Sequence, residues 1–405
     1  MASSSQSLRY VFYGGVEGAY QNQDIDDPRY LSLDYGATVG DYEEGELITG
    51  FIELSGDALA IANSVPRGTE FVLSASTPGI DFFFEQPRVG DYTEANISTD
   101  IRMTLGAGGA PLSGLSLRVF DGGDGPNVTI GPTFVDIRDD NEAQARVDGL
   151  WLPENVTPLV LSGTDGNDTL RGTTKYNFLA GGLGDDSLFL KTGQGWIWGG
   201  LGNDSIKGHD KGDFLFGGYG NDKILGRGGD DVIRGGDGQD DVRGERGNDT
   251  VDGGSGNDSV KGGSGNDTLG GQHGNDQMFG NDGRDTIRGG HGDDTIDAGS
   301  GDDWIYGGWG DDVLKGGPGS DTFLFSSADG GGRDTVTDFR PGVDFITIEN
   351  DLFETFQQML AEYTEQVGRN VQITYALGPE GSVITLTNIK IAELRASDFG
   401  FSPNG

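Results

Sequence analysis

A nine-residue period runs through the middle of this chain and restricts its fold more than any other feature. From Gly163 to Leu324 the frame holds without insertion or deletion, which makes eighteen consecutive units. The eighth position of every unit is apolar, from Leu170 in the first unit to Phe323 in the last. Such regularity is typical of a solenoid, in which each repeat packs only against its neighbours.

Each unit divides into a turn and a short strand. Glycine at the first, second and fourth positions permits positive φ and tight turning. The last three residues, such as "SVK" at 259–261, place one apolar side chain inward and two side chains outward. Two units therefore close one flattened coil. Since strands lie about 4.8 Å apart, the pattern predicts a parallel β-roll about 40 Å long.

Aspartate holds the sixth position of every unit except two, where Asn177 and Gly195 stand. Two thin rows of Leu, Ile and Val do not offset the backbone entropy that so many glycines lose on ordering. Carboxylates stacked along one edge converge with turn carbonyls, and such an all-oxygen cage suits Ca²⁺ rather than Mg²⁺ or Zn²⁺. The predicted ligands are Asp168, Asp186, Asp204, Asp213, Asp222, Asp231, Asp240, Asp249, Asp258, Asp267, Asp276, Asp285, Asp294, Asp303, Asp312 and Asp321.

Three of the units, "GGSGNDSVK", "GGHGDDTID" and "GGWGDDVLK", resemble the GGxGxDxUx nonapeptide of RTX proteins. The resemblance covers residues 163–324 and implies a secreted, calcium-binding β-roll. Residues 325–405 resemble the region after the RTX repeats in serralysin proteases and mannuronan epimerases, which implies an uncleaved type I secretion signal. The competing interpretation is a disordered Gly/Asp-rich linker, but a linker does not keep an apolar residue at every eighth position.

Alternate units lie on opposite edges of such a roll, so we distinguish an odd edge and an even edge by unit number. The odd units keep Asp at the sixth position throughout. The even units begin with "GTTKYNFLA", "LKTGQGWIW" and "GHDKGDFLF", which lack two of three aspartates and place Lys175 and Lys211 where glycine is usual. We expect the first even sites to be empty, with about eight ions on the odd edge and about five on the even edge, or about thirteen Ca²⁺ ions in all.

Large aromatic residues occupy outward strand positions in those same three even units. An exposed patch of this size is unusual for a soluble monomer. Packing beneath the preceding domain is one interpretation, and a surface for a ligand or for self-assembly is the other. The residues are Phe178, Trp196, Trp198, Phe214 and Phe216.

The composition excludes several classes of partner. A formal net charge of −39 disfavours nucleic acid and anionic membrane surfaces. No apolar stretch is long enough for a membrane-spanning helix, so we expect no membrane insertion. The absence of Cys rules out disulfides and thiolate metal sites. The start "MASSSQSLRYVFYGG" does not read as a cleavable secretory signal, so export would use another route.

Residues 1–160 read as an antiparallel β-sandwich, with alternating runs such as "ELITGFIEL" and "LSLRVF" between turn residues. The ending "TFVDIRDDN" resembles the last strand of a Calx-β domain. The segment has no His, Cys or Lys, which excludes a Ser-His-Asp hydrolase, a zinc protease of the HExxH type and a Schiff-base lysine. Carboxylates such as Asp81 and Glu85, with Ser, Tyr and Arg, remain as catalytic candidates.

The sequence therefore predicts an all-β protein in three parts: a β-sandwich at 1–160, a parallel β-roll at 163–324, and a small α+β cap at 325–405. We expect a secreted, calcium-dependent, non-enzymatic surface or matrix protein that folds on Ca²⁺ outside the cell. Its partners besides calcium would be other copies of itself or an extracellular polysaccharide. The alternative is a polysaccharide-active enzyme or polysaccharide-binding module with its site in residues 1–160.

Overall fold

The structure is a computed structural model. It describes residues 158–326, 331–349, 352–376 and 382–402, together with ten strands between residues 8 and 153. The chain divides into two compact units, Met1–Pro158 and Leu159–Gly405, each of which is described by itself. Within the described residues, no helix has the length and hydrophobicity needed to cross a membrane.

The described strands of the first unit pair antiparallel and form one ten-stranded sheet. Nine of them run in the order β3-β6-β7-β8-β9-β10-β1-β2-β4, and β5 pairs with β7. Antiparallel pairing agrees with the sequence, while the sandwich arrangement stays a prediction. The strands are β1 (Leu8–Gln21), β2 (Leu47–Leu54), β3 (Glu70–Leu73), β4 (Ile80–Glu85), β5 (Asn96–Ile97), β6 (Ile101–Thr104), β7 (Ser113–Phe120), β8 (Asn127–Ile130), β9 (Phe134–Arg138) and β10 (Ala143–Pro153).

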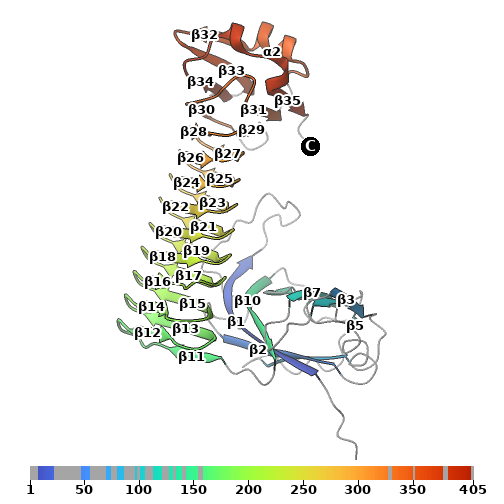
Figure 1. Ribbon diagram of the computed structural model, residues 1–405, viewed down its shortest axis with the longest axis vertical. Helices are drawn as coiled ribbons and strands as arrows, with labels where there is room; N and C mark the ends of the chain where they lie inside the picture. Colours follow the sequence, from blue (N-terminus) through green and yellow to red (C-terminus); the bar gives the residue numbers. More distant parts are fainter. Residues whose placement is uncertain are drawn as a thin grey trace, which may run out of the picture. The chain divides into compact units, whose positions relative to one another are not determined.

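Two sheets build a parallel β-solenoid in the second unit, and consecutive strands alternate between them (Figure 1). Partners in one sheet are eighteen residues apart, as in the pair Leu188 and Ile206. One sheet has twelve strands: β11 (Leu159–Ser162), β13 (Tyr176–Leu183), β15 (Gln194–Leu201), β17 (Phe214–Tyr219), β19 (Val232–Asp237), β21 (Thr250–Ser255), β23 (Thr268–His273), β25 (Thr286–His291), β27 (Trp304–Trp309), β29 (Thr322–Ser326), β31 (Phe345–Glu349) and β35 (Phe399–Ser402).

The second sheet has thirteen strands. They are β12 (Thr169–Gly172), β14 (Ser187–Leu190), β16 (Ser205–Lys207), β18 (Lys223–Gly228), β20 (Asp241–Arg246), β22 (Ser259–Ser264), β24 (Gln277–Asp282), β26 (Thr295–Ser300), β28 (Val313–Lys315), β30 (Arg333–Val336), β34 (Ser382–Leu386), β33 (Asn370–Ala376) and β32 (Thr364–Val367). The last two join antiparallel. The odd turns precede strands of this sheet and the even turns precede strands of the other sheet.

The core of the roll is the thin double row of eighth-position side chains that the period predicts. Ile206, Ile224 and Val242 from one sheet and Ile197 and Leu215 from the other are fully buried. They belong to one continuous hydrophobic cluster along the roll. The turns, which carry the polar residues, lie on either side of this narrow core and form the two edges of the roll.

The strands are longer than the three residues expected from each unit. Many have six residues, such as β18 at Lys223–Gly228, which runs through the end of one unit into the start of the next. The extension arises because turn amides also pair between coils: the Gly184 N–H donates to the Leu201 carbonyl at 2.8 Å, and the Gly202 N–H donates to the Tyr219 carbonyl at 2.8 Å.

Both sheets continue beyond the last nonapeptide. Strand β30 pairs with β28, and β31 pairs with β29. A short helix, α2 (Phe356–Glu362), begins at Thr355, whose hydroxyl accepts the Gln358 N–H at 3.2 Å. Two 3₁₀ turns come after it, η1 (Ile391–Glu393) and η2 (Ala396–Asp398). Phe323 of the last unit joins one hydrophobic cluster with buried residues of this C-terminal segment, so the apolar core extends past residue 324.

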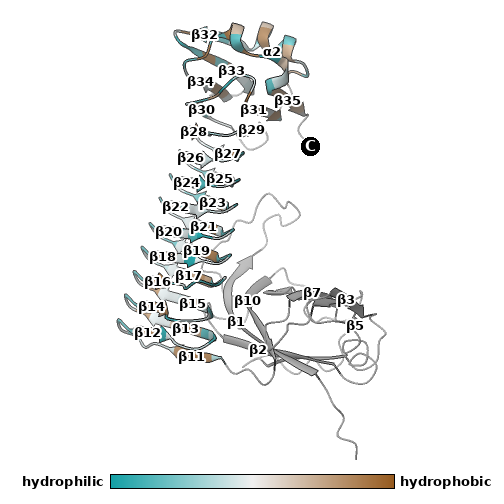
Figure 2. Cartoon of the chain, viewed as in Figure 1, coloured by the Kyte–Doolittle hydropathy of each residue, from teal (hydrophilic) through white to brown (hydrophobic). Residues whose placement is uncertain are grey.

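The five aromatic side chains predicted on the first even units are all buried in the structure. Trp196 lies at the centre of this group, with ring centroids 6.3 Å from Phe178, 6.5 Å from Trp198 and 5.7 Å from Phe216. Figure 2 shows hydrophobic residues on the first coils and again around α2, whereas most rungs between them are hydrophilic or neutral. That residues 1–160 cover these side chains stays a prediction.

Backbone geometry explains the glycines at the second and fourth positions, which take positive φ. At the fourth position, Gly256 has a φ of 133°, and a Cβ there would overlap the Gly238 carbonyl of the preceding coil. Non-glycine residues take positive φ at the second position in a few units, as at Arg227 and Glu245. In the described repeats, no non-glycine residue takes positive φ at the fourth position, so that position is restricted to glycine more strictly than the second.

Replacing Gly256 with Ala should destabilise the calcium-loaded roll by about 1 to 3 kcal/mol, because the substitution adds backbone strain and a collision with the neighbouring coil. Gly270→Ala is the matched control, since its Cβ would meet no atom nearer than Gln272 Nε2 at 3.3 Å. Thermal unfolding in calcium should show a lower Tm for the first variant only. Equal Tm values for the two variants would contradict this account of the turn.

Candidate calcium-binding edges

The sixth-position aspartates form a hydrogen-bonded ladder along each edge. On the odd edge, the Asp240 N–H donates to Asp258 Oδ1 at 2.8 Å, and the Asp258 N–H donates to Asp276 Oδ1 at 2.8 Å. On the even edge, the Asp231 N–H donates to Asp249 Oδ1 at 2.8 Å. One oxygen of each carboxylate is thus used to join successive coils.

The other oxygen of most ladder aspartates is buried and has no hydrogen-bond partner. Among the residues that the structure describes, eight such Oδ2 atoms lie on the odd edge and five on the even edge. Those on the odd edge belong to Asp186, Asp204, Asp222, Asp240, Asp258, Asp276, Asp294 and Asp312. Those on the even edge belong to Asp231, Asp249, Asp267, Asp285 and Asp303. A buried carboxylate oxygen left without a partner is strongly unfavourable, so each of these carboxylates needs either a cation or a proton.

The first position, which is glycine in most units, lies beside this oxygen. A Cβ at Gly235 would overlap both Asp240 Oδ2 and the carbonyl oxygen of Gly253 in the next coil. The even edge repeats the arrangement, since a Cβ at Gly226 would overlap Asp231 Oδ2. A carboxylate and a carbonyl therefore face one small space beside the first-position residue, which is glycine in most units and Ala298 in the unit of Asp303.

The donors around this space are all oxygens, which fits Ca²⁺ better than softer metal ions. Within the described part of the chain, no three His, Cys, Asp or Glu side chains converge on one point. The ladder geometry accounts for this, because each turn contributes a single carboxylate and the backbone supplies the remaining oxygens. The residues present therefore fit a calcium ion held between coils.

Burial raises the pKa of the ladder aspartates when no cation is bound. Desolvation is the main cause, opposed by the backbone hydrogen bond from the preceding coil and reinforced by neighbouring carboxylates. It raises the pKa of Asp240 to about 8 and the pKa of Asp231 to about 9, from an ordinary value of 3.8. Asp231 and Asp240 are thus poorly ionised at neutral pH unless a cation compensates them.

Three of the sixteen predicted ligands have a protein donor at Oδ2 instead. Asp168 accepts the Thr164 N–H at 2.7 Å and its hydroxyl at 2.8 Å. Asp213 accepts the His209 N–H at 2.8 Å.

The third of these ligands is Asp321, whose Oδ2 accepts a hydrogen bond from Arg340 at 3.2 Å. All three residues stand at the ends of the rows, and their role as ligands stays a prediction.

The irregular even units replace a cation with protein groups. Asn177 Nδ2 donates to the carbonyls of Thr174, Thr192 and Gln194 at 3.0, 3.1 and 3.2 Å. Leu190 is buried beside Gly195, where the sixth-position aspartate is missing. An amide nitrogen and an apolar side chain therefore occupy the part of the even edge that the sequence predicts to be free of ions.

Two ladder residues were missed by the sequence reasoning. Asp334 Oδ1 accepts the Asp312 N–H at 3.2 Å, and Asp344 Oδ1 accepts the Asp321 N–H at 3.2 Å. Each extends its edge by one coil, but at spacings of 22 and 23 residues, which break the nine-residue frame. The remaining signal was the G-x-D-x-U-x pattern in "GRDTVT" and "GVDFIT".

A second ladder, at the fifth position of the units, was also missed. The Asn221 N–H donates to Asn203 Oδ1 at 2.8 Å, and the Gln239 N–H donates to Asn221 Oδ1 at 2.7 Å. The sequence signal for this ladder was the frequent occurrence of Asn and Asp at the fifth position. These outer hydrogen bonds join the coils without a cation.

Comparison with family models gives a match to the RTX calcium-binding nonapeptide repeat, in overlapping segments that together span residues 162–323. This part of the chain consists of RTX calcium-binding repeats. The matched segments are 162–197, 191–217, 198–233, 207–242, 234–269, 270–304 and 288–323. The family model thus covers the ladders and leaves residues 1–161 and 324–405 unassigned, so the serralysin-like and Calx-β resemblances stay predictions.

Solved structures similar to this chain include two bacterial proteins. The AlgE6R3 subunit of the Azotobacter vinelandii mannuronan C5-epimerase is 23% identical with a TM-score of 0.26, covering 37% of this chain and 81% of its own. The extracellular lipase LipA from Serratia marcescens is 21% identical with a TM-score of 0.20, covering 52% of this chain and 40% of its own. A search of the curated proteins gives no match.

The raised pKa values predict that acid can replace calcium in part. The pKa of a ladder aspartate is about 3.8 when unfolded and reaches about 9 in the folded, calcium-free roll. The folded form binds more protons in this interval, so its stability is highest below about pH 4 and falls as the pH rises towards 9. Circular dichroism in EDTA should show β structure at pH 4 that is lost at pH 8. β structure in EDTA that is present at pH 8 and lost at pH 4 would refute the assignment of buried, uncompensated carboxylates.

Asp258→Asn should weaken calcium binding while preserving the ladder. The Asn Oδ1 can still accept the Asp240 N–H, but the amide nitrogen that replaces Oδ2 cannot bind a cation. Asp237→Asn is the control, since it removes a charge of the same sign from the third position of an odd unit. Calcium titration should show a higher midpoint for the first variant only. Equal midpoints would mean that the charge, and not its position, matters.

Proposed function

We propose that residues 163–324 are a calcium-dependent folding module that condenses after the chain leaves the cell. The observation that carries this proposal is the set of thirteen buried Oδ2 atoms without a partner, twelve of which lie beside a first-position glycine whose Cβ would overlap the oxygen. Calcium would supply the charge that these carboxylates lack. Extracellular calcium modules bind with Kd values of about 10⁻⁴ to 10⁻³ M, which matches a switch between the cell interior and the outside.

The charge of the chain supports this order of events. A net charge of −39 keeps the calcium-free chain extended by self-repulsion. About thirteen divalent ions would offset about 26 of those negative charges. The same self-repulsion favours export as an unfolded chain through a type I route, with its signal in residues 325–405.

We propose a non-enzymatic surface or matrix role for the folded protein. Residues 1–160 contain no His, Cys or Lys, which removes the commonest nucleophilic and general-base arrangements.

The third-position residues of the odd units lie in register along the odd edge and form a column that includes Leu201, His273, His291 and Trp309. Exposed side chains in this column support an adhesive function, because they offer contact area to another copy of the chain or to a polysaccharide. His273 and His291 stack at 4.9 Å in this column, Trp309 lies 5.1 Å from His291, and Leu201 and Trp309 are 45% and 41% exposed.

Removing calcium at pH 7.5 should unfold the roll, because its narrow core does not compensate the buried charge. Circular dichroism of the full chain should show a loss of β structure in EDTA and its recovery in millimolar calcium, with magnesium as the control ion. Equal β content in EDTA and in calcium would contradict the proposed function.

A further inference from the structure

Each row of unpartnered Oδ2 atoms ends next to an aspartate whose Oδ2 accepts a hydrogen bond from the protein. One of these donors, at the end of the even edge, carries a positive charge. Within the described residues, the even-edge row of Oδ2 atoms runs up to Asp303. The next aspartate, Asp321, has the same position in its unit and the same burial, with a side chain 0% exposed. Its Oδ2 nevertheless has a partner, the guanidinium of Arg340.

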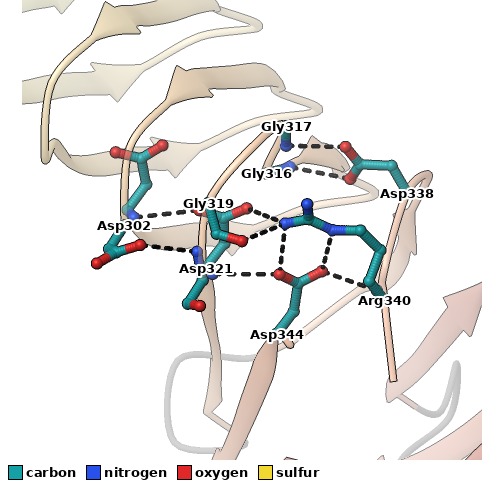
Figure 3. Close-up of polar contacts among 10 residues, drawn as sticks. Asp302, Gly316, Gly317, Gly319, Asp321, Asp338, Arg340 and Asp344 are labelled. Carbon is teal, nitrogen blue, oxygen red and sulfur yellow. Dashed lines mark hydrogen bonds and ion pairs between the residues drawn. The ribbon is translucent and has the colours of Figure 1, made fainter. Parts of the chain in front are cut away.

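Arg340 reaches into the last even turn and contacts the groups that a cation would contact. Its Nη2 donates to the Gly319 carbonyl at 2.6 Å, to Asp321 Oδ2 at 3.2 Å and to Asp344 Oδ1 at 2.7 Å, while Nε donates to Asp344 Oδ2 at 3.1 Å (Figure 3). Two carboxylates and one turn carbonyl thus converge on a single positive group. These are the same kinds of donor that face the space in the other turns.

The charges and burial require such a group at this position. The side chains of Asp321 and Asp344 are 0% and 2% exposed, and they belong to successive coils of the ladder. Both carboxylates contact the same nitrogen, Arg340 Nη2, and two buried carboxylates at such short range repel each other without a cation between them. The guanidinium is always protonated and presents several donors in one plane, so it can compensate both.

Local contacts hold Arg340 in place. Asp338 accepts the Gly316 N–H at 3.0 Å and the Gly317 N–H at 2.8 Å, which ties the segment before Arg340 to the last unit. The backbone N–H of Arg340 donates to Asp344 Oδ2 at 2.7 Å. Figure 3 shows these carboxylates on either side of the guanidinium. The arginine is therefore positioned by the turn itself.

We propose that the Arg340 guanidinium is a built-in cation that replaces calcium in the last even turn, between Asp321 and Asp344. This inference rests on the proposed calcium-dependent folding of the other turns. It means that the even edge binds no calcium at Asp321 and that the final coil stays folded at calcium concentrations too low for the rest of the roll. The folded end then offers a preformed edge onto which preceding coils assemble as calcium rises.

Hydrogen exchange of the full chain, measured by mass spectrometry, tests the proposal with Arg340→Gln. The control is Arg333→Gln, an exposed arginine in β30 whose backbone N–H, rather than its side chain, joins the preceding coil. In EDTA, peptides covering 333–349 should exchange slowly in the wild type and in the control, and rapidly in Arg340→Gln. In saturating calcium, the slow exchange should return in Arg340→Gln, and native mass spectrometry should find one further bound ion.

Two results would overturn the role of Arg340. One is equal exchange of 333–349 in EDTA for the wild type and Arg340→Gln. The other is rapid exchange in Arg340→Gln that calcium does not reverse, because the arginine would then be needed for a reason other than its charge. Peptides from 217–300 report separately on the proposed function. If they exchange equally in EDTA and in calcium, calcium-dependent folding is wrong, whatever the result at 333–349.

Discussion

The roll depends on what compensates the carboxylates buried along its two edges. Each ladder aspartate uses one oxygen to accept an amide from the preceding coil, which holds the second oxygen inside the turn. The hydrogen bond that joins the coils thus creates the buried charge that opposes folding. We propose that a cation between coils resolves this conflict and couples the stability of the solenoid to calcium.

The same constraint explains why glycine and aspartate occur together in most units. The first-position glycine leaves the space beside Oδ2, as at Gly235 and Asp240, and a side chain there would occupy it. Where the aspartate is lost, at Gly195, the first position carries the apolar residue Leu190 instead. The pairing is frequent but not strict, since Gly172 precedes Asn177, and Ala298 precedes Asp303, whose Oδ2 also has no partner.

The nine-residue period predicted the core of the roll and the rows of aspartates on its edges. Fully buried Ile206 and Leu215 lie where the eighth position placed them, and the stacked aspartates lie on two edges. The period could not predict Asp334 and Asp344, because insertions change their spacing while the coils still stack. Nor could it predict Arg340, whose role depends on a turn outside the repeats. The ends of a periodic structure are set by tertiary contacts that periodicity does not encode.

The most direct test is the position of every bound ion, by anomalous diffraction from crystals grown with calcium. The account predicts ions beside the thirteen unpartnered Oδ2 atoms, eight on the odd edge and five on the even edge. It predicts none at Asn177 and none between Asp321 and Asp344, where protein groups stand. Calcium at either of these places, or ladder carboxylates that remain buried without an ion, would contradict it.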